Sequence, residues 1–99
     1  ITVIIINNGV LGMVRQWQKM FYSCRYSHTT LERQTDFAAV ARAFGAAGFC
    51  ATNLEELQTI LDHSAPKDGP CVIDCRIDMD ENVLPMIPPG CSVREMILK

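Results

Sequence analysis

Three features are missing from this sequence: an excess of basic charge, a long apolar run and a Cys-x-x-Cys pair. Its nine lysines and arginines are scattered among eleven acidic residues, giving a net charge of −2, which argues against a nucleic-acid partner. The apolar runs are too short to span a bilayer, and the start lacks the basic region of a secretory signal. We therefore expect no membrane partner, and a cytoplasmic location, or a chloroplast or mitochondrion if the source is eukaryotic.

The cysteines and histidines do not form a recognisable metal or disulfide pattern. The cysteines are five in number, and no two have zinc-ligand spacing: Cys24, Cys50, Cys71, Cys75 and Cys91. We interpret most of them as small hydrophobic residues, with a redox role as the alternative. Cys71 and Cys75 should share one strand face. His28 and His63 have no acid or thiol at ligand spacing and are predicted to lie on the surface.

Hydrophobic residues make up 48% of the chain and charged residues 20%, which is too apolar for a disordered segment. A chain of 99 residues can form one domain that buries roughly two thirds of its unfolded surface. The sequence begins inside an apolar run rather than at a methionine, so we expect it to be part of a longer polypeptide.

Apolar patterning predicts an α/β fold with a partial parallel sheet flanked by helices. We expect strands at 2–6, 48–51 and 71–77, and helices at 11–22, 36–44 and from a capping box at 52–55 to about His63. The first strand has no polar alternation, which is typical of a central strand covered on both faces. Residues 1–81 would form the α/β core. Residues 82–99 would form an irregular C-terminal arm, with three prolines up to Gly90 and a final short helix at 92–99.

Each predicted helix has an apolar stripe that should face the core. These stripes are Met13, Trp17, Met20 and Phe21 in the first helix; Phe37, Val40, Ala41 and Phe44 in the second; and Leu54, Leu57 and Leu61 in the third. Thr35 should cap the second helix and Gly45 should end it. Residues 23–30 have the composition of an exposed connection, and 17–30 is predicted to be mobile. Solvation is expected for Arg15, Lys19 and Arg25, and for a strand exit containing Asp74, Asp78, Asp80 and Glu81.

The candidate site lies where the first strand runs into Asn7, Asn8 and Gly9. Parallel sheets bind ligands just beyond the carboxyl ends of their strands. An asparagine oxygen suits Mg²⁺, and the helix that opens at Gly12 presents free N–H groups to an anion such as a diphosphate. The alternative is an ordinary turn, because Asn and Gly tolerate left-handed backbone angles.

Residues 7–17 read NNGVLGMVRQW, and this run resembles the second half of the thiamine diphosphate and Mg²⁺ motif of the acetolactate synthase (acetohydroxyacid synthase) catalytic subunit. Residues 80–90, DENVLPMIPPG, resemble the carboxyl-terminal arm of the same family. The two matches occur in the family's order, so the resemblance covers essentially the whole chain. It implies the C-terminal part of a thiamine diphosphate-binding domain.

The resemblance also implies roles for individual residues. The side-chain oxygen of Asn8 and the backbone carbonyl of Val10 would bind Mg²⁺. Three residues would lie beside thiamine diphosphate: Leu11, Gly12 and Met13. Val14 and Trp17 would face the pocket for the second substrate, where Trp17 favours 2-ketobutyrate over pyruvate; a core position is the alternative for Trp17. No catalytic residue is implied within this chain.

The implied activity is that of the complete protein: condensation of pyruvate with a second 2-keto acid, pyruvate or 2-ketobutyrate, with loss of CO₂, in branched-chain amino acid biosynthesis. A homodimer of catalytic subunits is implied, with a regulatory subunit as a further candidate partner. FAD would be bound by a domain absent from this chain. The Gly-Asp-Gly half of the metal motif and the activating glutamate are also absent here, so we expect this chain alone to be inactive.

Two alternatives stay open. Another thiamine diphosphate-dependent carboligase, such as glyoxylate carboligase, shares the paired asparagines, although Trp17 and the arm at 85–90 favour acetolactate synthase. A catalytically silent α/β interaction module is the second, and an upstream Gly-Asp-Gly would argue against it. A nicotinamide-binding Rossmann domain is excluded because no Gly-x-Gly-x-x-Gly follows the first strand.

Overall fold

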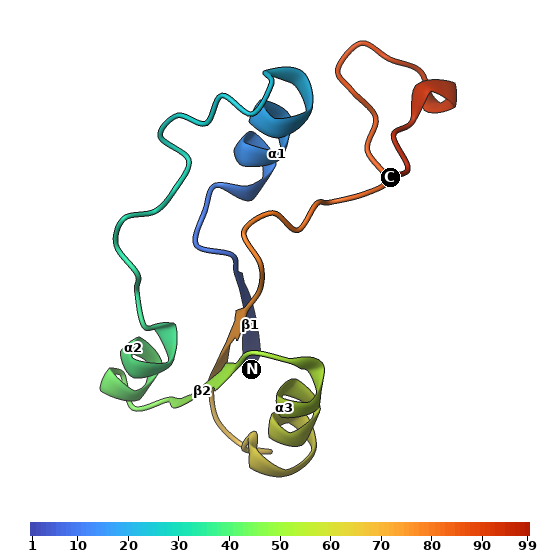
Figure 1. The fold of residues 1–99 in the computed structure, drawn as a ribbon. Helices are drawn as coiled ribbons and strands as arrows, with labels where there is room; N and C mark the ends of the chain where they lie inside the picture. The colour runs from blue at the N-terminus through green and yellow to red at the C-terminus, as the bar shows by residue number, and fades with distance from the viewer.

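The computed structural model describes all 99 residues and contains a three-stranded parallel sheet with helices on both of its faces (Figure 1). The strands are β1 (Thr2–Asn7), β2 (Ala47–Ala51) and β3 (Cys71–Arg76), in the order β1-β3-β2. The central strand β3 places Ile73 between Ile4 of β1 and Phe49 of β2. This arrangement confirms the predicted α/β fold with a partial parallel sheet.

Strand β1 lies at an edge of the sheet, so the expectation of a central strand is wrong for this chain. Its Ile4 and Ile6 side chains are exposed, whereas Ile73 of β3 is fully buried. The reason is that the helices pack on β2 and β3 rather than on β1. The apolar side chains on both faces of β1 therefore do not mean that both faces are covered within this chain.

The core lies on the face of the sheet that α3 covers. Its five buried residues are Ala51, Ile60, Cys71, Ile73 and Cys75. Cys71 and Cys75 share this face as predicted, and burial raises the pKa of the Cys75 thiol. All five cysteines are free, and burial supports the interpretation as small hydrophobic residues only for Cys71 and Cys75, because the other three are exposed: Cys24, Cys50 and Cys91.

Helix α2 (Phe37–Ala43) covers the opposite face through small residues. The predicted stripe is right for Ala41, which is buried, and for Phe37, which is half-buried, but wrong for Val40, which is exposed, and for Phe44, which is 88% exposed. Ala38, which lay outside that stripe, is buried as well. The helix approaches so closely that a Cβ on Gly48 would collide with the Ala38 carbonyl oxygen.

The cap of α2 also differs from the prediction. The N-cap is Asp36 rather than Thr35, and its Oδ1 accepts a hydrogen bond from the Ala39 N–H at 2.8 Å. Gly45, with φ +80°, follows the last turn in the left-handed conformation, as predicted for a helix-ending glycine.

Helix α3 (Leu54–Thr59) continues into a π-helical turn, η1 (Ile60–Ser64). The predicted capping box at 52–55 does not form: the N-cap is Asn53, whose Oδ1 accepts from the Glu56 N–H at 2.8 Å, and the Glu56 carboxylate accepts from the N–H of Thr52, the residue before the cap, at 2.7 Å. These bonds from Thr52 hold the pKa of Glu56 below its usual range. The buried face runs through Leu57 and Ile60. Leu54, 82% exposed, and Leu61 face away from the core, contrary to expectation.

The C-terminal arm, residues 82–99, extends away from the sheet (Figure 1). An antiparallel bridge between Met86 and Ile97 closes it into a loop. Instead of the predicted final helix it contains one 3₁₀ turn, η2 (Val93–Glu95), stabilised by a capping box between Ser92 and Glu95. Hydrogen bonds from Ser92 lower the pKa of Glu95. Nowhere in the structure is a helix both long enough and apolar enough to cross a membrane.

Candidate functional site

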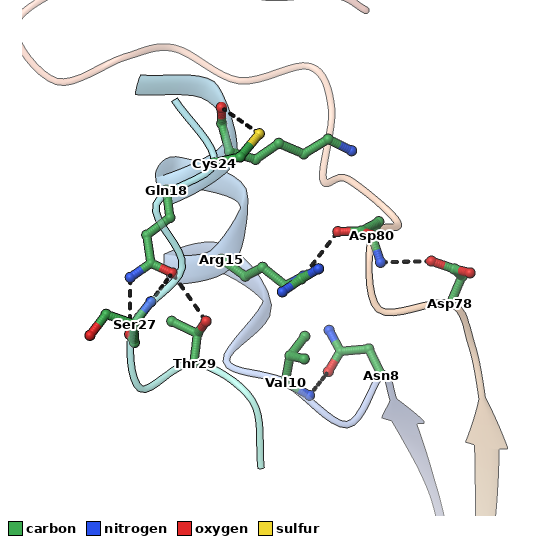
Figure 2. Close-up of polar contacts among 10 residues, drawn as sticks. Asn8, Val10, Arg15, Gln18, Cys24, Ser27, Thr29, Asp78 and Asp80 are labelled. Atoms are coloured by element: carbon green, nitrogen blue, oxygen red, sulfur yellow. Dashed lines mark hydrogen bonds and ion pairs between the residues drawn. The ribbon is translucent and has the colours of Figure 1, made fainter. Parts of the chain in front are cut away.

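Two asparagine side chains build the turn that follows β1. Oδ1 of Asn7 accepts a hydrogen bond from the Gly9 N–H at 3.3 Å, and Oδ1 of Asn8 accepts from the Val10 N–H at 3.2 Å (Figure 2 shows the second contact). Between them Gly9 has φ +66°, a conformation that favours glycine. These contacts confirm the predicted turn.

Val10 leaves its backbone carbonyl without a partner in this turn. Val10 is buried and forms a β-bridge with Thr30, but the two hydrogen bonds of this bridge are made by the residues next to Val10 and Thr30. Leu11 donates to the Thr29 carbonyl at 2.8 Å, and Leu31 donates to the Gly9 carbonyl at 3.0 Å. No N–H group of the chain donates to the Val10 oxygen. A hard cation such as Mg²⁺ satisfies a carbonyl of this kind.

Helix α1 (Gly12–Phe21) begins directly after the turn, without a side-chain cap and without an acidic residue in its first turn. Its first backbone bond runs from the Arg15 N–H to the Leu11 carbonyl at 2.9 Å, so the N–H groups of Gly12, Met13 and Val14 have no backbone acceptor. They are available to an anion. A Cβ at Gly12 would lie 2.6 Å from Nδ2 of Asn8, so glycine permits this close approach.

The apolar residues of α1 lie mostly on its exposed side, contrary to the prediction that they face the core. Trp17 is 38% exposed, and Met13, Val14 and Phe21 are exposed as well. The rings of Trp17 and Phe21 meet edge to face, with 6.4 Å between their centroids. This exposure argues against a core position for Trp17 and leaves an apolar surface beside the turn.

Gln16 is the buried residue of α1, 3% exposed, and the sequence analysis missed it. Its Nε2 donates to the Val83 carbonyl at 3.1 Å, and its Oε1 accepts from the Val83 N–H at 2.8 Å. The Met86 sulfur lies 3.7 Å from Nε2. Gln16 therefore fastens the C-terminal arm to α1. No local signal distinguished Gln16 from Gln18, the other amide of this helix, because Val83 lies 67 positions away in the sequence.

Arg15 was expected to be solvated, but its side chain is only 12% exposed. Its Nε lies 2.9 Å from Oδ1 of Asp80, and its guanidinium lies 4.0 Å from the centre of the Tyr26 ring. Figure 2 shows this pair together with the Asp80 N–H, which donates to Asp78 at 2.7 Å. The hydrogen bond between Arg15 and Asp80 raises the pKa of Arg15 and lowers the pKa of Asp80. The contact joins α1, the connection at 23–30 and the segment after β3.

The connection at 23–30 is exposed, as predicted, apart from the buried Thr29. Gln18 of α1 holds it: its Nε2 donates to the Ser27 carbonyl and its Oε1 accepts from the Thr29 hydroxyl, both at 3.0 Å (Figure 2). His28 and His63 are exposed, as predicted. No group of three or more His, Cys, Asp or Glu side chains is arranged to hold a metal ion.

Asp74 is fully buried, so the prediction of a solvated strand exit is wrong for this residue but right for Asp78, Asp80 and Glu81. Position 74 belongs to the central strand, where it pairs with Ile5 on one side and Cys50 on the other. Asn7 Nδ2 donates to its Oδ1 at 2.9 Å. This contact places a buried carboxylate directly against the first of the paired asparagines.

Residues 1–75 match the family model described as the thiamine pyrophosphate enzyme, C-terminal TPP binding domain. This match agrees with the α/β fold and its parallel sheet. The chain therefore belongs to the thiamine pyrophosphate enzymes and forms part of their C-terminal cofactor-binding domain.

Within this class the chain is similar to acetolactate synthase large subunits, which confirms the resemblance. It is 43% identical over 98% of its length to the isozyme 2 large subunit of Escherichia coli (strain K12) and 43% identical over 98% to the large subunit of Pyropia yezoensis. It is 37% identical over 99% of its length to the mitochondrial catalytic subunit of Aspergillus candidus. The chain spans 18%, 17% and 14% of the length of these relatives, respectively.

Proposed function

We propose that this chain supplies the cofactor-anchoring end of an acetolactate synthase catalytic subunit. The complete protein would condense pyruvate with a second 2-keto acid, pyruvate or 2-ketobutyrate, with loss of CO₂, in branched-chain amino acid biosynthesis. The observation that carries the proposal is the turn after β1, where the Asn8 amide and the unpaired Val10 carbonyl lie beside the open start of α1. The similarity to acetolactate synthase large subunits supports the choice of reaction.

Asn8 and Val10 would hold Mg²⁺ through their oxygens. The Asn8 Oδ1 has two lone pairs and uses one for the Val10 N–H, so the other is available to the cation. The N–H groups of Gly12, Met13 and Val14 would meet the diphosphate, with Leu11 and Met13 side chains beside the cofactor. Bound there, thiamine diphosphate would supply the electron sink that lets a 2-keto acid lose CO₂.

Val14 and Trp17 would form the apolar wall of the second-substrate pocket, because both side chains are exposed beside the turn. The C-terminal arm, fastened to α1 by Gln16, would help exclude water from this wall. FAD, a second catalytic subunit and a regulatory subunit would bind to or through other parts of the complete protein. The isolated chain would therefore be inactive.

The test is Asn8→Ala in the complete protein, read as thiamine diphosphate binding at limiting Mg²⁺. Loss of a metal ligand should weaken binding on the order of tenfold or more. Asn53→Ala is the matched control, because this asparagine caps α3 and does not touch the turn. Removing that cap should cost about 1 kcal/mol of stability without changing cofactor affinity. Unchanged binding by the Asn8→Ala protein at limiting Mg²⁺ would refute the proposal.

A further inference from the structure

We infer that Asp74 is a positioning residue for the cofactor turn: its buried carboxylate orients the Asn7 amide and thereby the turn that presents Asn8 and Val10. The inference rests on the proposed function, because it assumes that this turn binds Mg²⁺ and thiamine diphosphate. Asp74 lies 67 positions after Asn7 in the sequence and belongs to a different strand.

A continuous set of hydrogen bonds connects Asp74 to the turn. Asp74 Oδ1 accepts from Asn7 Nδ2 at 2.9 Å, and the other end of the same amide, Asn7 Oδ1, accepts from the Gly9 N–H at 3.3 Å. Gly9 precedes Val10, whose N–H in turn bonds to the Asn8 amide at 3.2 Å. The orientation of the Asn7 amide therefore affects both proposed metal ligands.

The acceptor oxygen of Asp74 explains why a carboxylate suits this position. In its ionised form a carboxylate only accepts hydrogen bonds, so it selects the Asn7 orientation in which Nδ2 faces Asp74 and Oδ1 faces Gly9. The reversed amide would bring its oxygen against the carboxylate and its NH₂ group against the Gly9 N–H. Asp74 thus excludes the orientation that would break the turn.

Asp74 is otherwise a costly residue at this position. It is fully buried in the central strand, and its Oδ2 has no hydrogen-bond partner. The nearest cation is the mostly exposed Arg76, with Nε at 3.8 Å from Oδ2. Neighbouring positions of β3 hold Ile73 and Cys75, which meet no such cost. Burying a partly satisfied carboxylate opposes folding, so the presence of Asp74 at this position needs an explanation. Its hydrogen bond with Asn7 provides that explanation.

The experiment exchanges donor and acceptor across the contact in the complete protein. Asn7→Asp keeps the oxygen that accepts from Gly9 but sets two carboxylates against each other. It should raise the Mg²⁺ concentration that gives half-maximal thiamine diphosphate binding by about tenfold, as measured by calorimetric titration without substrate. Adding Asp74→Asn supplies an NH₂ donor on the other side of the contact. The double variant should return to within about threefold of the original protein.

A merely structural role for Asp74 predicts a different pattern, in which the melting temperature changes and the Mg²⁺ requirement does not. Ile73→Val, a change in the buried neighbour on the same strand, is the control for that pattern. Asp74→Leu gives an independent reading should Asn7→Asp fail to fold, with the same tenfold weakening expected.

Wild-type Mg²⁺ dependence in a folded Asn7→Asp or Asp74→Leu protein overturns the inference. A double variant no better than Asn7→Asp alone overturns it as well. If the unmodified complete protein binds no thiamine diphosphate at saturating Mg²⁺, the proposed function fails instead, so the two failures are distinguishable.

Discussion

Asn8 shows that the two interpretations of the paired asparagines are compatible. Its side chain closes the turn by accepting from the Val10 N–H, as an ordinary turn asparagine does. The same oxygen retains a second lone pair, and the neighbouring Val10 carbonyl has no donor in the chain. The turn therefore arranges the two oxygens that the proposed metal site needs.

Trp17→Leu should change which second substrate the complete enzyme prefers. The indole is partly exposed on α1, so its loss should leave the fold and acetolactate formation largely intact. One methylene in an apolar pocket is worth about 1–3 kcal/mol, so the preference for 2-ketobutyrate should fall by roughly tens-fold. The measurement is the product ratio when pyruvate and 2-ketobutyrate compete.

Phe21→Leu is the control for Trp17→Leu, because Phe21 contacts the indole from the far end of α1 and is not expected to line the pocket. It should leave the product ratio near that of the original enzyme. An unchanged ratio in the Trp17→Leu enzyme would contradict the assigned pocket.

The close contact between α2 and the sheet depends on the absence of a side chain at Gly48. Gly48→Ala would place a Cβ against the Ala38 carbonyl, and backbone cannot move aside as a flexible side chain can. We expect a loss of about 1–3 kcal/mol in the free energy of unfolding. Denaturant unfolding would measure it, with Cys50→Ala at an exposed position of β2 changing stability by less than about 0.5 kcal/mol. Equal stabilities for the two variants would show that α2 can shift.

Gln16 is the side chain of α1 that bonds to the C-terminal arm. Gln16→Leu keeps the size of the residue but removes both bonds to Val83, so the arm should separate from the helix. Hydrogen exchange at the Val83 amide should become faster, which mass spectrometry can measure. Gln18→Leu is the matched control, because it releases the connection near Ser27 and Thr29 instead. Unaltered protection at Val83 in the Gln16→Leu protein would contradict this role.

Over the whole molecule, Arg15 and Asp80 link α1 to the segment after β3 in a pH-dependent way. The Asp80 pKa is lowered in the folded state, so the link stabilises the fold above the ordinary aspartate pKa of about 3.9. The stabilisation is lost as the pH falls through the lowered value, because protonated Asp80 no longer pairs with Arg15.

Arg15→Gln should return the Asp80 pKa toward its ordinary value, which NMR titration of the carboxyl carbon would show. Glu56 is the internal control, because its lowered pKa comes from Thr52 and is independent of Arg15. An Asp80 titration that is the same in both proteins would mean that the ion pair does not form in solution.

The secondary structure of this chain could largely be predicted from the sequence, because strand and helix patterns depend on neighbouring residues. The predicted strands at 2–6, 48–51 and 71–77 correspond to Thr2–Asn7, Ala47–Ala51 and Cys71–Arg76. The site turn was also found, since paired asparagines and a glycine act within a few residues. Element ends were less accurate: the Asp36 cap and the brief η2 turn depend on one or two hydrogen bonds each.

Burial was set by long-range contacts that periodicity does not contain. Strand order put the first strand at an edge and Asp74 at the centre, although their local sequences suggested the reverse. Close packing of α2 buried Ala38 and Ala41 and left Phe44 outside. Gln16 and Asp74 became important only because Val83 and Asn7, distant along the chain, lie beside them. Short-range backbone preferences thus specify the elements and the turn, whereas the partner of each polar group is known only once those elements have packed.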